Sequence, residues 1–215
     1  MGKAKIRASA RIAGKNAADF SREASFIARG FVQIAGVDEA GRGPLAGPVS
    51  AAAVILDPDR IPDGLADSKT LSEARRAALF EQICATATVS VAFASARTID
   101  RINIRQASLD AMARAVCGLS VAADFALVDG RDIPGGLSIG AQAVIGGDGK
   151  SLSIAAASVV AKVMRDRLMM RCETRYSGYG FSGHKGYGTQ VHRDAITRLG
   201  PCALHRMTFA PLKTC

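Results

Sequence analysis

The segment from Val37 to Val49, with the sequence VDEAGRGPLAGPV, restricts the fold of this chain more than any other part of it. An apolar run that begins at Phe31 leads into Asp38 and Glu39, and such a run is typical of a buried strand. Glycine and proline follow at once, and both interrupt regular strand pairing. The sequence therefore predicts a strand that ends in two carboxylates, beside a loop whose glycines let a ligand approach the backbone closely.

The residue types in this segment indicate a particular chemistry. Carboxylate oxygens suit hard cations such as Mg²⁺ and Mn²⁺, whereas the Arg42 side chain and free backbone N–H groups suit phosphate. A metal site next to a phosphate site is typical of phosphodiester chemistry.

Two further apolar runs end in an acid next to glycine, at Asp129 and Asp148. A single aspartate at a strand end is usually a turn former or a helix cap. If all three strands share one sheet edge, however, four carboxylates converge there, and only bound cations or raised pKa values relieve their repulsion. Because neighbouring strand residues point to opposite faces, Asp38 and Glu39 can share a site only if the strand twists or ends between them.

The order of the expected elements indicates an α/β fold. Strands are predicted near residues 31–37, 49–56, 88–94, 125–128 and 141–145, and helices over about 70–83, 104–119, 153–174 and 189–199. This order suits a mixed five-stranded sheet with helices on its faces and a C-terminal helical portion, although the pattern alone allows several α/β folds.

The net charge of +9 favours a polyanionic partner, and it is unevenly distributed. Residues 1–30 hold seven basic and two acidic side chains, a net charge of +5. We expect a basic, flexible extension over residues 1–30 and one domain over residues 31–215. A solubilising tail, a nucleic-acid-binding arm and an organelle-targeting peptide all remain open for the extension.

Cysteine and hydropathy patterns bear on the compartment. The five cysteines are widely spaced without a C-x-x-C pair, which favours free thiols in a reducing compartment. No apolar run approaches the length of a membrane span, and no signal peptide is recognisable. We expect a cytoplasmic protein that is a monomer and does not bind a membrane.

The segment at residues 37–49 resembles the signature of the ribonuclease HII family, and so do Val-Asp-Gly at 128–130, Gly-Asp at 147–148 and Gly-Tyr-Gly-Thr at 186–189. The resemblance extends from about Phe31 to Phe209. It implies a ribonuclease H-like fold and two-metal hydrolysis with Mg²⁺ or Mn²⁺. The implied catalytic and metal-binding residues are Asp38, Glu39, Asp129 and Asp148. Aspartate at the last position, with only a short N-terminal segment, favours ribonuclease HII over ribonuclease HIII.

The resemblance also implies a substrate, namely RNA–DNA hybrids and duplex DNA that contains ribonucleotides, cut on the 5′ side of the ribonucleotide. Residues expected to contact it are Gly41, Arg42 and Gly43 in the loop, Tyr187 beside the ribonucleotide, and Lys69 near the backbone. Further candidates for phosphate contact are Lys162, Arg165, Arg167, Lys185 and Arg206. The three histidines have spacing that suits neither zinc nor a catalytic triad, so structural or phosphate-adjacent roles are expected for them.

Two other functions remain possible from the sequence. One is a different metal-dependent nuclease on the same fold, such as a DNA-resolving or ribonuclease HI-like enzyme. The other is a nucleic-acid-binding module without catalysis. That module would be expected to lack one of the acids, and all four are present.

Overall fold

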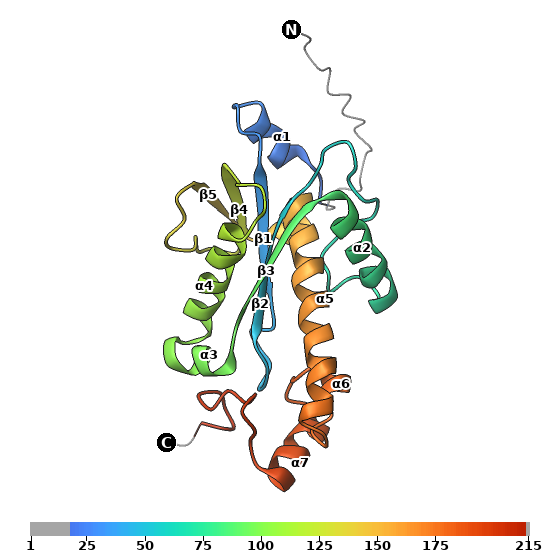
Figure 1. The fold of residues 1–215 in the computed structure, drawn as a ribbon, viewed down its shortest axis with the longest axis vertical. Coiled ribbons are helices and arrows are strands. Elements are labelled where there is room, and N and C mark those ends of the chain that lie inside the picture. Colours follow the sequence, from blue (N-terminus) through green and yellow to red (C-terminus); the bar gives the residue numbers. More distant parts are fainter. Residues whose placement is uncertain (1–17, 214–215) are drawn as a thin grey trace.

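A mixed five-stranded sheet forms the centre of the protein (Figure 1). The structure is a computed structural model and describes residues 18–213. The strands lie in the order β3-β2-β1-β4-β5. Their bounds are Ile34–Ala40 for β1, Val49–Ile55 for β2, Thr88–Ala94 for β3, Phe125–Asp129 for β4 and Gly140–Val144 for β5. β1, β2 and β3 pair antiparallel, whereas β4 runs parallel to both β1 and β5. The C-terminal ends of β1, β3, β4 and β5 therefore lie at the same edge of the sheet.

Helices cover both faces of this sheet (Figure 1). α3 and α4 lie on one face, α2 and α5 lie on the other, and α6 and α7 extend the molecule beyond the lower end of the sheet in this view. The helices are α1 (Ser21–Ile27), α2 (Glu73–Thr86), α3 (Ala96–Ile102), α4 (Ile104–Cys117), α5 (Leu152–Arg175), α6 (Phe181–His184) and α7 (Gln190–Leu199), with a 3₁₀ turn, η1, at Gly147–Gly149. The result is the expected α/β layer arrangement.

Alternate residues of β1 enter two separate cores. Ala35 and Val37 pack with the buried face of α4, whereas Gly36 faces α5. A Cβ atom at Gly36 would lie 2.0 Å from the carbonyl carbon of Ser153, so the backbone of α5 rests directly on the strand. The small buried residues of the first half of α5 permit the same close packing along its length.

The predicted strands and long helices are confirmed, with two local differences. β1 begins at Ile34 because the Asp124 carboxylate accepts the N–H groups of Val32 and Gln33, which ties that segment down through a side chain. The helix α3 was not predicted. It is one short element capped by Ser95, and it is separated from α4 by Asn103, whose φ is +65°.

Residues 18–30 differ from the expected flexible extension. They include α1, where Phe26 stacks on Phe125 of β4 with 4.1 Å between ring centroids. Glu23 of α1 is buried, and one of its carboxylate oxygens accepts hydrogen bonds from Ser151 and Ser153 at the start of α5. The rest of the expected extension, residues 1–17, lies outside the described residues.

Within residues 18–213, we find no helix with both the length and the apolar character needed to cross a membrane.

Candidate active site

The four predicted acids come together at the C-terminal edge of the sheet. Asp38 and Glu39 occupy the last part of β1, and Asp129 ends β4, its parallel neighbour. Asp148 lies in η1, directly after β5. The N–H group of Gly147 donates a hydrogen bond of 2.6 Å to Asp129 Oδ1 and so joins the segments that carry the last two acids.

The acids perturb one another electrostatically. Burial raises the pKa of Asp38 well above its usual value, and the charges of Glu39, Asp129 and Asp148 raise it further. Burial also raises the pKa of Glu39, against the effect of the Arg42 guanidinium. The pKa of Asp148 is raised by burial and then by nearby carboxylates, Asp129 among them. Asp129 thus contributes to the raised pKa of all three partners, which makes it their common neighbour.

Asp38 and Glu39 share the site although the strand does not end between them. β1 continues to Ala40, so the two side chains leave opposite faces of the strand. Asp38 is 5 % exposed, and its carboxylate accepts the N–H group of Glu39 at 2.7 Å. The Glu39 carboxylate forms an ion pair of 3.2 Å with Arg42. The charge of Asp129 raises the pKa of both carboxyl groups because β4 ends beside them.

These carboxylates are the residues that could hold a divalent cation. Across the described part of the chain, no three His, Cys, Asp or Glu side chains form a ready-made metal-binding group. The donor chemistry nevertheless fits Mg²⁺ or Mn²⁺, because both prefer oxygen ligands and their charge would relieve the repulsion that raises these pKa values.

The glycine-rich loop between β1 and β2, residues 41–48, borders the acids, and we call it the GRG loop. Gly41 has φ = +96°, and Arg42 and Gly43 are exposed. Arg165 of α5 and Arg206 of the C-terminal segment lie fully buried beneath the loop and bind its carbonyl groups. The prediction that these two arginines contact phosphate is therefore wrong, since neither side chain is accessible.

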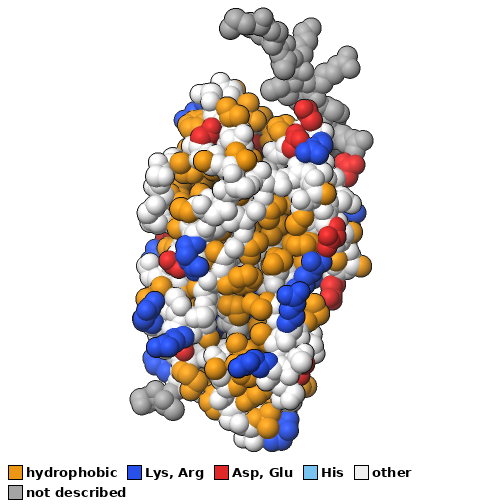
Figure 2. Space-filling model, viewed as in Figure 1, with side chains coloured by type: hydrophobic (Ala, Val, Ile, Leu, Met, Phe, Trp, Pro, Cys, Tyr) orange, Lys and Arg blue, Asp and Glu red, His pale blue; other side chains and the backbone are white. Residues whose placement is uncertain are grey.

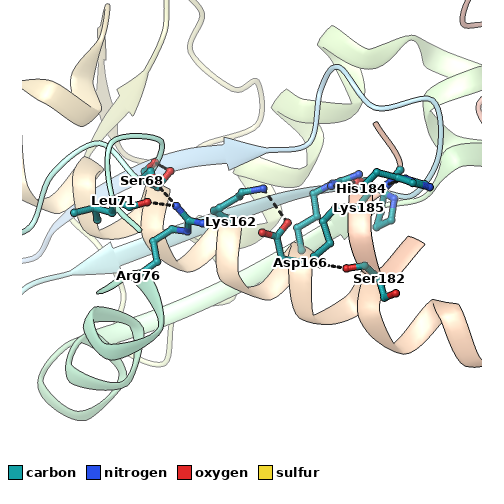
Figure 3. A network of polar contacts seen from close by, with 12 residues as sticks. Ser68, Leu71, Arg76, Lys162, Asp166, Ser182, His184 and Lys185 are labelled. Carbon is teal, nitrogen blue, oxygen red and sulfur yellow. Dashed lines mark hydrogen bonds and ion pairs between the residues drawn. The ribbon is translucent and has the colours of Figure 1, made fainter. Parts of the chain in front are cut away.

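Lys69 lies beside the acids. Its ammonium nitrogen is 3.6 Å from Asp148 Oδ2 and 3.8 Å from Asp67 Oδ1, and its side chain is largely exposed. Arg76 fixes the surrounding turn by donating to the carbonyl oxygens of Ser68 and Leu71, each at 2.6 Å (Figure 3). This places an exposed ammonium group directly beside the predicted acids.

Tyr187 belongs to a second segment, residues 184–189, that lies against the GRG loop. We call it the tyrosine segment. The N–H groups of Leu45 and Ala46 donate to the carbonyl oxygen of Gly186 at 2.9 and 3.3 Å. Tyr187 is 44 % exposed, and the ammonium of Lys162 lies 5.8 Å from the centroid of its ring. The predicted contact residues of the loop and Tyr187 are thus brought together.

The histidines support this region from within. His192 and His205 are buried and lie 3.1 Å apart at their Nε2 atoms, and His184 stacks on His192 with 4.3 Å between centroids. Burial lowers the pKa of His192 to about 4, so it stays neutral at physiological pH. This packing agrees with the structural role expected for the three residues.

Comparison with known proteins gives the family. The sequence matches Ribonuclease HII over residues 35–212. The chain belongs to the ribonuclease HII family. Ribonuclease HII of Rhizobium leguminosarum bv. trifolii is 60% identical over 195 residues, which cover 91% of this chain and 85% of the relative.

Solved structures of the ribonuclease HII family share the fold. The enzyme of Archaeoglobus fulgidus, solved as a PCNA:RNase HII complex, superposes with a TM-score of 0.72 at 28% identity over 86% of this chain and 98% of that one. The ribonuclease H2 of Pyrococcus horikoshii OT3 gives a TM-score of 0.72 at 24% identity, covering 85% and 96%. The ribonuclease H-like fold is therefore confirmed.

Three buried residues have structural roles that the sequence does not reveal. The sequence predicts phosphate contacts for Arg165 and Arg206 and places Glu23 in the basic extension. An acid within a predominantly basic segment is the available signal for Glu23. For Arg206, the signal was its place beside His205 in the last motif of the chain.

Proposed function

We propose that this chain is a metal-dependent endoribonuclease that cuts the RNA strand of RNA–DNA hybrids and the phosphodiester on the 5′ side of a ribonucleotide in duplex DNA. The products are a 3′-hydroxyl and a 5′-phosphate. The observation that carries the proposal is the convergence of Asp38, Glu39, Asp129 and Asp148 beside the GRG loop. Membership of the ribonuclease HII family supports it.

Each group of residues has a separate role in the proposed reaction. The four carboxylates hold Mg²⁺ or Mn²⁺, which when bound lowers the pKa of a water molecule and stabilises charge on the departing sugar oxygen. The ribonucleotide binds to the GRG loop through Gly41, Arg42 and Gly43, whose backbone amides can hydrogen-bond to it. Its 2′-hydroxyl is the group that distinguishes a ribonucleotide from DNA. The Tyr187 ring packs on the neighbouring sugar, and Lys69 holds a phosphate near Asp148.

Surface charge is consistent with a nucleic-acid substrate. Figure 2 shows several Lys and Arg side chains over the lower half of the molecule as drawn. In the matching view of Figure 1, α3 and the lower part of α5 lie at that end. Positive charge there attracts the substrate polyanion, while the acids hold cations at the point of cleavage.

A cytoplasmic setting and a monomeric state complete the proposal. The four described cysteines, Cys84, Cys117, Cys172 and Cys202, are free thiols, as in proteins of reducing compartments.

The test uses a labelled DNA duplex with a single ribonucleotide, incubated with Mg²⁺, with Mn²⁺ or with a chelator. We expect a metal-dependent cut on the 5′ side of the ribonucleotide, lost in Asp129→Asn and kept in Asp110→Asn. Asp110 is a matched control because it pairs with Arg114 on the exposed face of α4. Cleavage of a long RNA–DNA hybrid alone would favour a ribonuclease HI-like enzyme. No cleavage of either substrate would favour a binding module.

A further inference from the structure

Two buried arginines donate hydrogen bonds to main-chain carbonyl oxygens of the GRG loop. Arg165 donates from Nε to Pro48 at 2.9 Å and from Nη2 to Ala46 at 3.1 Å. Arg206 donates from Nη1 to Arg42 at 2.7 Å and from Nη2 to Gly41 at 2.6 Å, and its Nε and Nη2 both reach Gly47, at 3.0 and 2.8 Å. Both side chains have 0 % exposure.

Burying two arginines in this way lowers the free energy of unfolding, so stability alone does not explain the arrangement. A buried cation loses its hydration, and dipolar carbonyl groups compensate it less completely than a carboxylate would. Burial accordingly lowers the pKa of both guanidinium groups, and for Arg206 the neighbouring charge of Arg165 adds to the effect. An apolar side chain could fill the same volume without this cost. What the two guanidinium groups add is a fixed direction for five carbonyl groups of one loop.

Because the carbonyl groups of the loop face inward to the arginines, backbone N–H groups on the outer side remain available to a ligand. Arg42 and Gly43 are exposed, and within the described part of the chain neither donates a main-chain hydrogen bond. A Cβ atom at Gly43 would meet nothing within 4 Å. The tip of the loop is therefore held from below and open above.

Arg165 also links this loop to the tyrosine segment. Its Nη1 donates to the carbonyl oxygen of Lys185 at 2.9 Å, and its Cζ lies 5.9 Å from the centroid of the Tyr187 ring. A Cβ atom at Gly41 would lie 1.9 Å from Arg165 Nε, so the guanidinium is wedged directly under the loop backbone. One side chain thus contacts both segments that carry the predicted ribonucleotide contacts.

We propose that Arg165 and Arg206 are positioning residues for substrate specificity: they hold the GRG loop and the tyrosine segment in the single relative geometry that recognises an isolated ribonucleotide. The inference rests on the proposed function. It assigns the arginines no contact with substrate or metal, because both are buried beneath the backbone that they orient.

The test compares Arg165→Lys and Arg206→Lys with wild type on two substrates, a DNA duplex with one ribonucleotide and an all-RNA strand paired with DNA. Lysine keeps the charge but lacks the planar fork of donors, so several carbonyl contacts are lost at once. Arg60→Lys is the matched control, since Arg60 pairs with Asp57 just beyond β2, at the opposite edge of the sheet.

We expect kcat/KM on the single-ribonucleotide duplex to fall at least ten times more than on the hybrid in both variants. The Mg²⁺ concentration for half-maximal activity should stay unchanged, because the acids are untouched. Equal losses on both substrates in variants that remain folded at the assay temperature would overturn the proposal. Failure of wild type to cleave either substrate would instead refute the proposed function.

A wild-type measurement keeps the proposal testable if a variant does not fold. Backbone amides 45–47 donate to Gly186 and Leu204 in the loop shape that the arginines hold. Hydrogen exchange should show these amides protected and Arg42 and Gly43 unprotected. Full exchange of amides 45–47 in the native protein would overturn the proposal, because the loop would then not be held.

Discussion

Gly36 is the position where a single methyl group should test the architecture of the site most severely. It lies in β1, two residues before Asp38, and faces the first turn of α5. In Gly36→Ala the new Cβ would lie 2.0 Å from the carbonyl carbon of Ser153 and 2.3 Å from the nitrogen of Ile154. Normal contact requires the strand and the helix to separate by about 1.4 Å.

The size of the effect follows from the atoms involved. Both are main-chain atoms, so no change of side-chain rotamer can relieve the contact, and overpacking of this kind costs about 3 kcal/mol or more. For a domain of this length the expected fall in Tm is about 6–12 °C. Because η1 precedes α5 directly, the shift should also move Asp148 and raise the Mg²⁺ requirement.

The assay is thermal unfolding followed by circular dichroism, with Mg²⁺-dependent cleavage measured in parallel. Gly135→Ala serves as control, since a Cβ atom there would meet nothing within 4 Å. A Gly36→Ala protein that unfolds within about 2 °C of wild type, with the same Mg²⁺ requirement, would refute the reasoning that the backbone of α5 rests on β1.

Three further outcomes can be measured directly. Burial and neighbouring carboxylates raise the pKa of Asp38 in the folded protein above its value in the unfolded chain. Asp38 therefore stabilises the folded state while its carboxyl group is neutral in both states, and this stabilisation is lost as pH rises through the raised pKa. Metal-free Asp38→Asn should therefore have a higher Tm than wild type at pH 8, and a lower Tm would contradict this. Tyr187→Ala should reduce cleavage of a single-ribonucleotide duplex more than cleavage of an RNA–DNA hybrid; equal losses would argue against its role. Glu23→Ala strands the donors of Ser151 and Ser153 and should lower the free energy of unfolding in urea by about 3 kcal/mol, whereas Glu23→Gln should lose less; indistinguishable variants would show that these bonds contribute little.

The sheet and its acids could be predicted because their signals are local. Residues 88–94 form a β-branched run that is a strand with the expected bounds, and Asp129 stands between an apolar run and a glycine. Knowing that several such strands end at one edge is enough to bring the four acids together. The sequence could not predict whether Asp38 and Glu39 belong to one site, because their side chains leave opposite faces of β1. They share a site because both lie near Asp129.

The supports of the site could not be predicted, because they depend on contacts between distant residues. An arginine within a helix looks like surface charge, and only the packed structure shows Arg165 bound to Pro48, 117 positions away. Glu23 reaches Ser153 across 130 positions and from a segment whose composition resembles a solvated tail. Local periodicity carries no information about such pairs.

The position of Arg206 has a consequence for the order in which this protein becomes functional during its synthesis. Its guanidinium holds the carbonyl of Arg42, which is made 164 residues earlier. At ordinary translation rates the two are separated by about 10–30 s. The strands and the acids can assemble in that interval, but the loop that we propose to recognise the ribonucleotide lacks its support. Under the proposed function, a nascent chain would bind cations before it discriminates among nucleic acids, and discrimination would be the last property acquired.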